Sequence, residues 1–209
     1  MKPQRAVCIG LTFKPEIKMK KLGITTILGL SALTGLSLSI AIAQTTSLDL
    51  RNTVTGQPMS LDEALPEGRD AEGVKIFLKT GRNPYNSDWS CLAKGQEAFL
   101  TACSGCHGHL AEGKIGPGLN DDYWTYPKNK TDQGLFETIF GGGQAQMGPQ
   151  SLNLTLDEML QVMAWTRHVY KDGPSGAEWM TDAEKAKFKP YDANEVVPKD
   201  APGLCSAAK

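Results

Sequence analysis

The chain of 209 residues contains the stretch Cys103-Ser104-Gly105-Cys106-His107, a C-x-x-C-H pattern. This spacing is the attachment signature of haem c. The short turn aims two thiols at the two vinyl groups of one porphyrin, and the histidine that follows is placed to reach the iron as an axial ligand. We therefore predict one covalent haem c, attached through both cysteines, with the histidine as an iron ligand.

Two other uses of a cysteine pair are considered. A zinc site needs a second pair of Cys or His ligands at metal spacing, but Cys91 and Cys205 stand singly in the sequence. A thioredoxin-like redox pair needs a preceding strand, but residues 92–102 have a helical pattern. Neither alternative has support outside the motif itself.

The residues that flank the motif agree with the haem hypothesis. In the predicted helix at 92–102, Gly95 and Phe99 are spaced i, i+4 and share a face. Glycine at that position lets a second helix cross closely. Downstream, Pro117 lies ten residues past His107, and its carbonyl is placed to accept the imidazole Nδ1 proton and so orient the ring. An ordinary Gly-Pro turn is the alternative explanation.

A second axial ligand is expected on the other side of the iron. His109 is too close to His107 to reach that side, and His168 falls within an amphipathic helical pattern. Met147 stands in the glycine-rich loop 141–149, where glycines permit the backbone to pass tightly over a porphyrin. Methionine is more often core filler, but a glycine-rich loop is a poor place for a core residue. We predict Met147 as the second ligand.

The start of the chain has the layout of an export signal. Residues 1–18 are interpreted as sequence upstream of a true start at Met19, and residues 19–43 as a signal peptide with a basic start, an uncharged apolar run and a small-x-small end at Ala41-Ile42-Ala43. A retained transmembrane helix is the alternative, because the apolar run is about long enough to span a bilayer. We expect cleavage, a periplasmic location and no membrane attachment afterwards.

Cleavage changes the charge and the cysteine count. Six of the 22 Lys and Arg residues and one of the 23 Asp and Glu residues precede residue 44, so residues 44–209 carry a net charge of −6. That charge argues against nucleic acid and anionic membranes as partners. Four cysteines remain, and in an oxidising compartment Cys91 and Cys205 are predicted to form a disulfide. Free thiols at these two positions are the alternative.

The rest of the sequence predicts an all-α fold. Thr131 or Asp132 caps a short helix that runs to residue 140, and Thr155 opens a capping box for a helix to about residue 171. With the helix at 92–102, these form a cytochrome domain at residues 88–172. Residues 44–87 form an N-terminal extension with one helix at 70–79. Residues 173–209 form a polar tail with few apolar residues, which the disulfide would anchor.

Three longer segments carry a family resemblance: CSGCHGHLAEGKIGPGL at 103–119, DDYWTYPKNKTDQGLFETIFGGGQAQMGPQ at 121–150 and LTLDEMLQVMAWTRHVY at 154–170. They resemble cytochrome c-L, the electron acceptor of pyrroloquinoline quinone methanol dehydrogenases in methylotrophic bacteria. The resemblance implies a class I cytochrome c core, methanol dehydrogenase as donor and a smaller cytochrome c as acceptor. Members of that family can also hold a calcium ion near a haem propionate, but no oxygen ligands for one stand out in this sequence.

Three aromatic residues complete the predicted site. Tyr123, Trp124 and Tyr126 follow the Gly-Pro turn, and their polar tips are placed to hydrogen-bond a haem propionate, although the pattern fits plain aromatic core equally well. Two other functions remain open: a cytochrome module that serves a different quinoprotein dehydrogenase or an oxidase, and a haem enzyme or sensor. The last would need an exchangeable iron position, which the Met147 loop disfavours.

Overall fold

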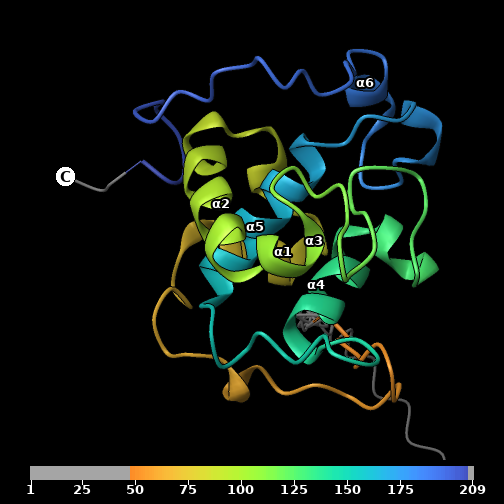
Figure 1. Ribbon diagram of the computed structural model, residues 1–209. Helices are drawn as coiled ribbons and strands as arrows, with labels where there is room; N and C mark the ends of the chain where they lie inside the picture. Colours follow the sequence, from red (N-terminus) through yellow and green to blue (C-terminus); the bar gives the residue numbers. More distant parts are fainter. Residues whose placement is uncertain (1–47, 207–209) are drawn as a thin grey trace, which may run out of the picture. The chain divides into compact units, whose positions relative to one another are not determined.

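The computed structural model describes residues 48–206, so the predicted leader at 1–18 and signal peptide at 19–43 lie outside the described residues. Within the described part the backbone is helical, and its one β-type contact is an isolated bridge between Arg51 and Pro58 (Figure 1). The all-α prediction is confirmed. No helix in residues 48–206 is long and apolar enough to cross a bilayer.

The described residues form six α-helices and four short 3-10 helices. The α-helices are α1 (Glu72–Thr80), α2 (Trp89–Ala102), α3 (Ser104–His107), α4 (Asp132–Gly141), α5 (Leu156–His168) and α6 (Asp182–Lys185). The 3-10 helices are η1 (Leu61–Glu63), η2 (Pro84–Ser87), η3 (Pro127–Lys130) and η4 (Pro174–Gly176).

The local signals in the sequence explain where these helices begin. Thr131 caps α4 by accepting a hydrogen bond from the backbone N–H of Gly134, and Thr155 and Glu158 form the predicted capping box of α5. Helix α2 begins at Trp89, three residues before the predicted start, because the Asp88 side chain caps it. Helix α5 ends at His168, three residues before the predicted end.

Helices α2 and α5 cross at close range, and Gly95 makes the crossing possible. A Cβ atom at Gly95 would lie 2.1 Å from the backbone oxygen of Gln161 on α5, so only glycine fits between the two backbones. Phe99, one turn further along α2, is fully buried beside the crossing. The close helix crossing predicted from the i, i+4 pair is confirmed.

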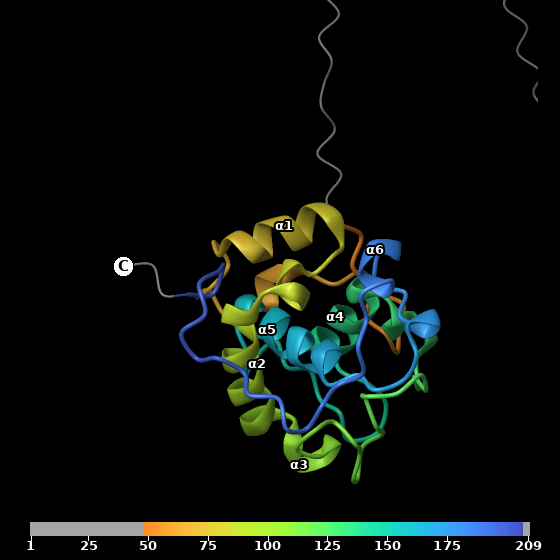
Figure 2. The ribbon, with the colours of Figure 1, turned by 90° about the horizontal axis from the view of Figure 1, so that it is seen from above.

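The N-terminal extension packs into the same core. Helix α1 covers one side of the fold (Figure 2), and its Phe77 ring lies 4.8 Å from the ring of Phe136 on α4, centroid to centroid. Tyr85, in η2, is fully buried and donates its hydroxyl hydrogen bond to Asp157 on α5. These contacts attach the extension to both α4 and α5.

The C-terminal tail runs along the outside of the fold in both views and returns to the start of α2 (Figures 1 and 2). There a disulfide joins Cys91 to Cys205, the predicted pairing, across a sequence separation of 114 residues. A cross-link over a loop of this length contributes about 4 to 5 kcal/mol in the chain-entropy treatment. Besides the disulfide, the tail is held by Trp179, one of its few apolar residues, which is buried and packs edge-on against Tyr170.

We predict that Gly95→Ala destabilises the fold by about 1–3 kcal/mol, because the added methyl forces α2 away from the α5 backbone. Urea denaturation of the two proteins measures the difference. Gly105→Ala is the matched control, because a Cβ atom there meets nothing within 4 Å. Gly105→Ala should leave the free energy of unfolding unchanged or raise it slightly. Equal stabilities of the two variants would contradict the role of the close crossing.

Candidate functional site

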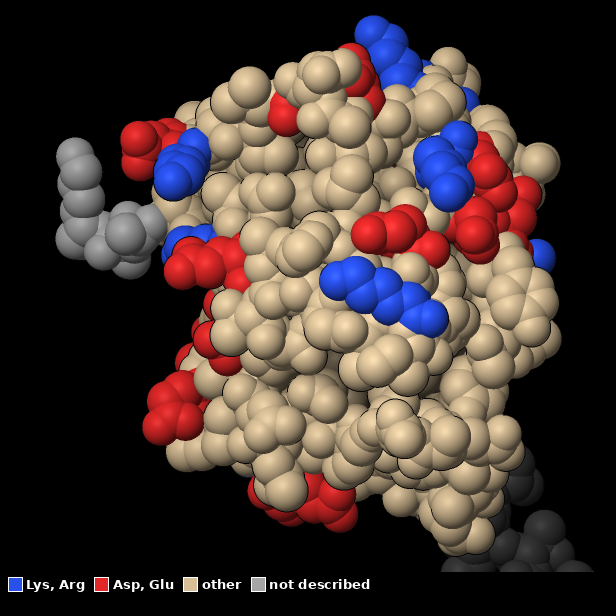
Figure 3. Space-filling model, viewed as in Figure 1, with Lys and Arg blue, Asp and Glu red and all other residues tan. Residues whose placement is uncertain are grey.

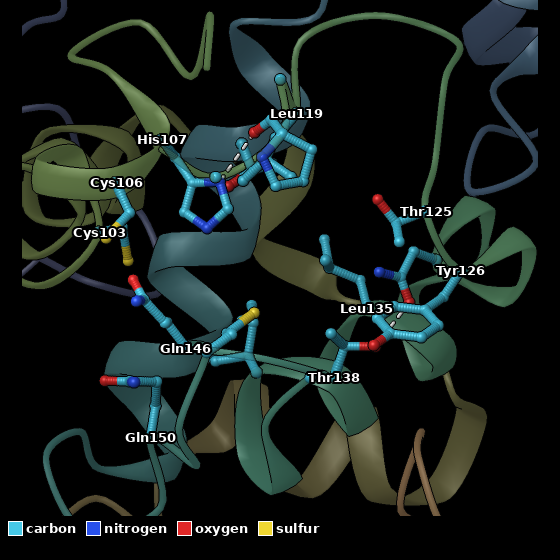
Figure 4. A pocket seen from close by; sticks show the side chains of 18 of the residues that line it. Cys103, Cys106, His107, Leu119, Thr125, Tyr126, Leu135, Thr138, Gln146 and Gln150 are labelled. Atoms are coloured by element: carbon cyan, nitrogen blue, oxygen red, sulfur yellow. Dashed lines mark hydrogen bonds between the residues drawn. The ribbon is translucent and has the colours of Figure 1, made fainter. Parts of the chain in front are cut away.

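A cavity of about 600 Å³ lies behind the C-x-x-C-H motif. Figure 4 shows its two sides, with His107 and both motif cysteines on one side and Leu135, Thr138 and Tyr126 on the other. None of the described residues that line it is Lys, Arg, Asp or Glu. Its apolar lining comes from α2, α4 and α5, and includes Phe99, Leu135, Ile139 and Val162. The cavity is therefore mostly apolar, and no Lys, Arg, Asp or Glu side chain of residues 48–206 lines it.

Helix α3 presents the motif to this cavity. The backbone N–H groups of Cys106 and His107 both donate to the carbonyl of Cys103, which folds the motif into one helical turn. Gly108 ends the turn with φ at +85°, a conformation that favours glycine. Burial, and secondarily the nearby Cys106 thiol, raise the pKa of the Cys103 thiol to about 11. Neither motif cysteine forms a disulfide within residues 48–206.

The imidazole of His107 is held in a fixed orientation. Its Nδ1 lies 2.9 Å from the carbonyl oxygen of Pro117, and because a carbonyl only accepts, Nδ1 carries the proton. The lone pair is then on Nε2, which is the atom left free to bind a metal. A Cβ atom at Gly116 would lie 2.8 Å from His107 Cε1, so glycine is required beside the ring. This is the hydrogen bond that the sequence predicts.

Met147 lines the cavity from the loop that follows α4. The loop is closed by the Gly143 N–H, which donates to the Met147 carbonyl at 2.9 Å, and by the Gln144 N–H, which donates to the Tyr126 hydroxyl at 2.6 Å. Gly142 has φ at +82°, and a Cβ atom there would collide with the Met147 carbonyl. The Tyr126 contact was not predicted, because it joins loops 18 residues apart.

The three residues predicted to contact a propionate lie differently in the structure, and Tyr126 lines the cavity while its hydroxyl accepts the Gln144 hydrogen bond. Trp124 lines the cavity and is 7% exposed, and its Nε1 has no hydrogen-bond partner among residues 48–206. Tyr123 is 70% exposed and does not line the cavity, so its expected role is not supported. Asp121 accepts the backbone hydrogen bond of Tyr123 in a tight turn, and Trp124, not Tyr123, reaches the cavity.

Two histidines outside the motif stand apart from the cavity. Neither His109 nor His168 lines it. His168 lies among Trp89, Trp165 and Tyr191, and burial lowers its pKa against the opposing effect of Glu195. Within residues 48–206, no group of three or more His, Cys, Asp or Glu side chains is arranged to hold a metal ion.

A helical core that encloses an apolar cavity behind a C-x-x-C-H motif is the arrangement of a c-type cytochrome. Residues 91–165 match the family described as cytochrome c oxidase, cbb3-type, subunit III. Cytochrome c-L from Methylorubrum extorquens is 53% identical over 186 residues, which cover 87% of this chain and 93% of that protein.

Two solved structures are similar as well. Cytochrome cL from the marine methylotroph Methylophaga aminisulfidivorans has a TM-score of 0.68 and 53% identity, covering 71% of this chain and 98% of that one. Cytochrome cL from Hyphomicrobium denitrificans has a TM-score of 0.66 and 54% identity, covering 70% of this chain and 88% of that one. The chain belongs to the cytochrome c-L family and is an electron-transfer protein, not an enzyme.

The residues present fit the haem c that the family implies. The cavity is apolar and uncharged, as a porphyrin ring requires, and two free thiols and one oriented imidazole face it from α3. The buried, unpartnered Nε1 of Trp124 is a hydrogen-bond donor suited to a carboxylate. Such a carboxylate is carried by each haem propionate.

We predict that Trp124→Phe lowers the midpoint reduction potential by tens of millivolts while haem content stays close to that of the parent. The phenyl ring keeps most of the apolar body, but the donor to an ionised propionate is lost, and that donor favours the reduced haem. Spectroelectrochemical titration measures the potential. Tyr123→Phe, which changes an exposed side chain, is the control and should leave the midpoint potential unchanged. A Trp124→Phe potential equal to the parent would indicate plain aromatic packing.

Proposed function

We propose that this protein is a periplasmic carrier of single electrons that receives them from a pyrroloquinoline quinone methanol dehydrogenase and passes them to a smaller cytochrome c. The observation that carries the proposal is the apolar cavity behind Cys103, Cys106 and His107, in a chain that is 53% identical to a curated cytochrome c-L. A covalently held cofactor suits a carrier in a compartment where free haem would be lost.

Four side chains would hold one haem c. Cys103 and Cys106 would attach it through thioether bonds, and His107 Nε2 and Met147 Sδ would be its iron ligands. When bound, haem c supplies reversible one-electron chemistry. A methionine ligand favours the reduced state and raises the potential. The hydrogen bond from His107 Nδ1 to Pro117 and the closed loop around Met147 would keep both side chains in place when the haem is bound.

The negative net charge favours a transient, charge-assisted encounter with a partner over a stable complex. Residues 44–209 carry a net charge of −6, which favours a donor with a basic docking patch. On the face shown in Figure 3, acidic and basic side chains stand close together over the upper half, and most of the lower half carries neither. A carrier must leave after each electron, so fast charge-assisted encounter is more useful than high affinity.

A second candidate partner follows from the match of residues 91–165 to the subunit III family of cbb3-type oxidases. In that case the domain would deliver electrons to a terminal oxidase, and another dehydrogenase would be its donor. Methanol dehydrogenase with methanol then fails to reduce the purified cytochrome, whereas the proposed function requires rapid reduction.

We expect Met147→Ala to abolish the weak near-infrared sulfur-to-iron band of the oxidised protein and to lower its reduction potential, because the thioether ligand is removed. Absorption spectroscopy of the purified oxidised variant checks this. His168→Gln, at a histidine away from the cavity, serves as the control and retains the band. Survival of the band in Met147→Ala would show that another side chain binds the iron.

The second-order rate of reduction by methanol dehydrogenase should fall steeply as ionic strength rises from 0.01 M to 0.15 M. Screening shortens the Debye length from about 30 Å to about 8 Å over that range, which removes steering by the acidic surface. Stopped-flow measurement of the rate tests this, and the intracomplex transfer step should not change. A rate that is flat in salt would remove electrostatic steering from the proposal and leave the haem site unaffected.

A further inference from the structure

His168, the last residue of α5, is enclosed by aromatic rings from three parts of the chain. Its ring centroid lies 5.6 Å from that of Trp89 at the start of α2, 5.7 Å from that of Trp165 on α5 and 5.4 Å from that of Tyr191 in the C-terminal tail. Trp165 is fully buried, and 15% of the His168 side chain is exposed. The imidazole therefore fills a mostly apolar space between two helices and the tail.

One carboxylate of the tail meets this ring. Glu195 Oε2 lies 3.1 Å from His168 Nε2, but the contact is not aligned as a hydrogen bond, and no other polar group among residues 48–206 bonds to Nε2. Four residues earlier, the Tyr191 N–H donates to the carbonyl of Tyr170 at 3.2 Å. Packing on His168 and this single backbone hydrogen bond hold residues 191–195 against the end of α5.

The charged groups of the two helices near His168 are engaged elsewhere. Asp88, at the start of α2, accepts the backbone hydrogen bonds of Ser90 and Leu204 at 2.9 and 2.7 Å. Arg167, the preceding residue on α5, has its guanidinium carbon 3.9 Å from the ring centroid of Trp179 and its Nε 3.4 Å from Asp132. Neither helix therefore supplies a charge to pair with the imidazole.

On the tail side, the other titratable groups do not pair with the imidazole either. Asp192 accepts hydrogen bonds from the backbone and the side chain of Asn194 in its own turn. Burial raises the pKa of the Tyr191 hydroxyl, so it stays neutral at and below neutral pH. Burial also lowers the pKa of His168, and Glu195 opposes that effect without cancelling it. The imidazolium is therefore more favourable in water than in this enclosure.

We propose that His168 and Glu195 form a pH-sensitive switch in the fold, in which protonation of His168 detaches residues 191–195 from the end of α5. A group whose pKa is lower in the docked state stabilises that state above its ordinary pKa of about 6.5, and this stabilisation is lost as the pH falls below that value. The disulfide keeps the end of the tail attached at Cys205, so the segment docks again when the pH rises.

The experiment follows the parent protein and three variants by NMR, as reduced holoproteins, between pH 7.5 and 5. The protection of the Tyr191 amide against hydrogen exchange, corrected for the intrinsic pH dependence, should fall at least threefold in the parent. It should not fall in His168→Gln. It should fall further in Glu195→Gln, because the carboxylate that favours the imidazolium is gone. His109→Gln, at an exposed histidine, is the matched control and should behave as the parent does.

The proposal is overturned if the parent keeps its Tyr191 protection down to pH 5, if His168→Gln loses protection as the parent does, or if His109→Gln removes the effect. A smaller fall in Glu195→Gln than in the parent would also overturn it, because the carboxylate would then be the controlling group. Should His168→Gln fail to fold, the ring titration of His168 in the parent decides, and a pKa at or above 6.5 contradicts the switch. None of these outcomes depends on the electron donor.

Discussion

The close contact between the backbones of α2 and α5 at Gly95 is the constraint on which the rest of the structure depends. It brings Phe99 of α2 and Val162 and Thr166 of α5 to the same cavity wall, and it places the end of α2, where the C-x-x-C-H turn begins, at the mouth of that cavity. A larger residue at position 95 would widen the crossing and displace the motif from the core that receives the porphyrin. The geometry of the site therefore depends on a residue that does not line the cavity.

Two further restraints hold the side chains that are predicted as iron ligands. His107 is oriented by the Pro117 carbonyl, and the Met147 loop is tied to the Tyr126 hydroxyl through the Gln144 N–H. Both restraints use groups that do not ligate the iron, and both limit side-chain motion without adding charge to the cavity. A carrier benefits from such rigidity, because ligands that stay in place require little rearrangement when the iron changes oxidation state.

Much of this could be predicted from short-range sequence patterns. Each of these patterns spans only a few residues, so it can be recognised in the local sequence: the motif itself, the i, i+4 pair of Gly95 and Phe99, the caps at Thr131 and Thr155 and the glycines around Met147. The contacts that could not be predicted join distant positions. Trp179 reaches Arg167 only after the tail folds back, and its burial has no local periodicity to reveal it. The sequence pattern does not distinguish Tyr123 from Trp124 as a cavity residue. The turn in which Asp121 accepts the Tyr123 N–H directs Trp124, and not Tyr123, to the cavity.

The central claim, that one haem is bonded covalently to the turn at residues 103–107, is tested most directly by mass spectrometry of the mature protein and of its proteolytic peptides. The account predicts that the intact protein carries the mass of one haem, that the added mass stays on the peptide containing Cys103 and Cys106 after denaturation, and that neither thiol reacts with an alkylating reagent. An unmodified peptide with two alkylated cysteines, from protein matured in a host that makes c-type cytochromes, would contradict it.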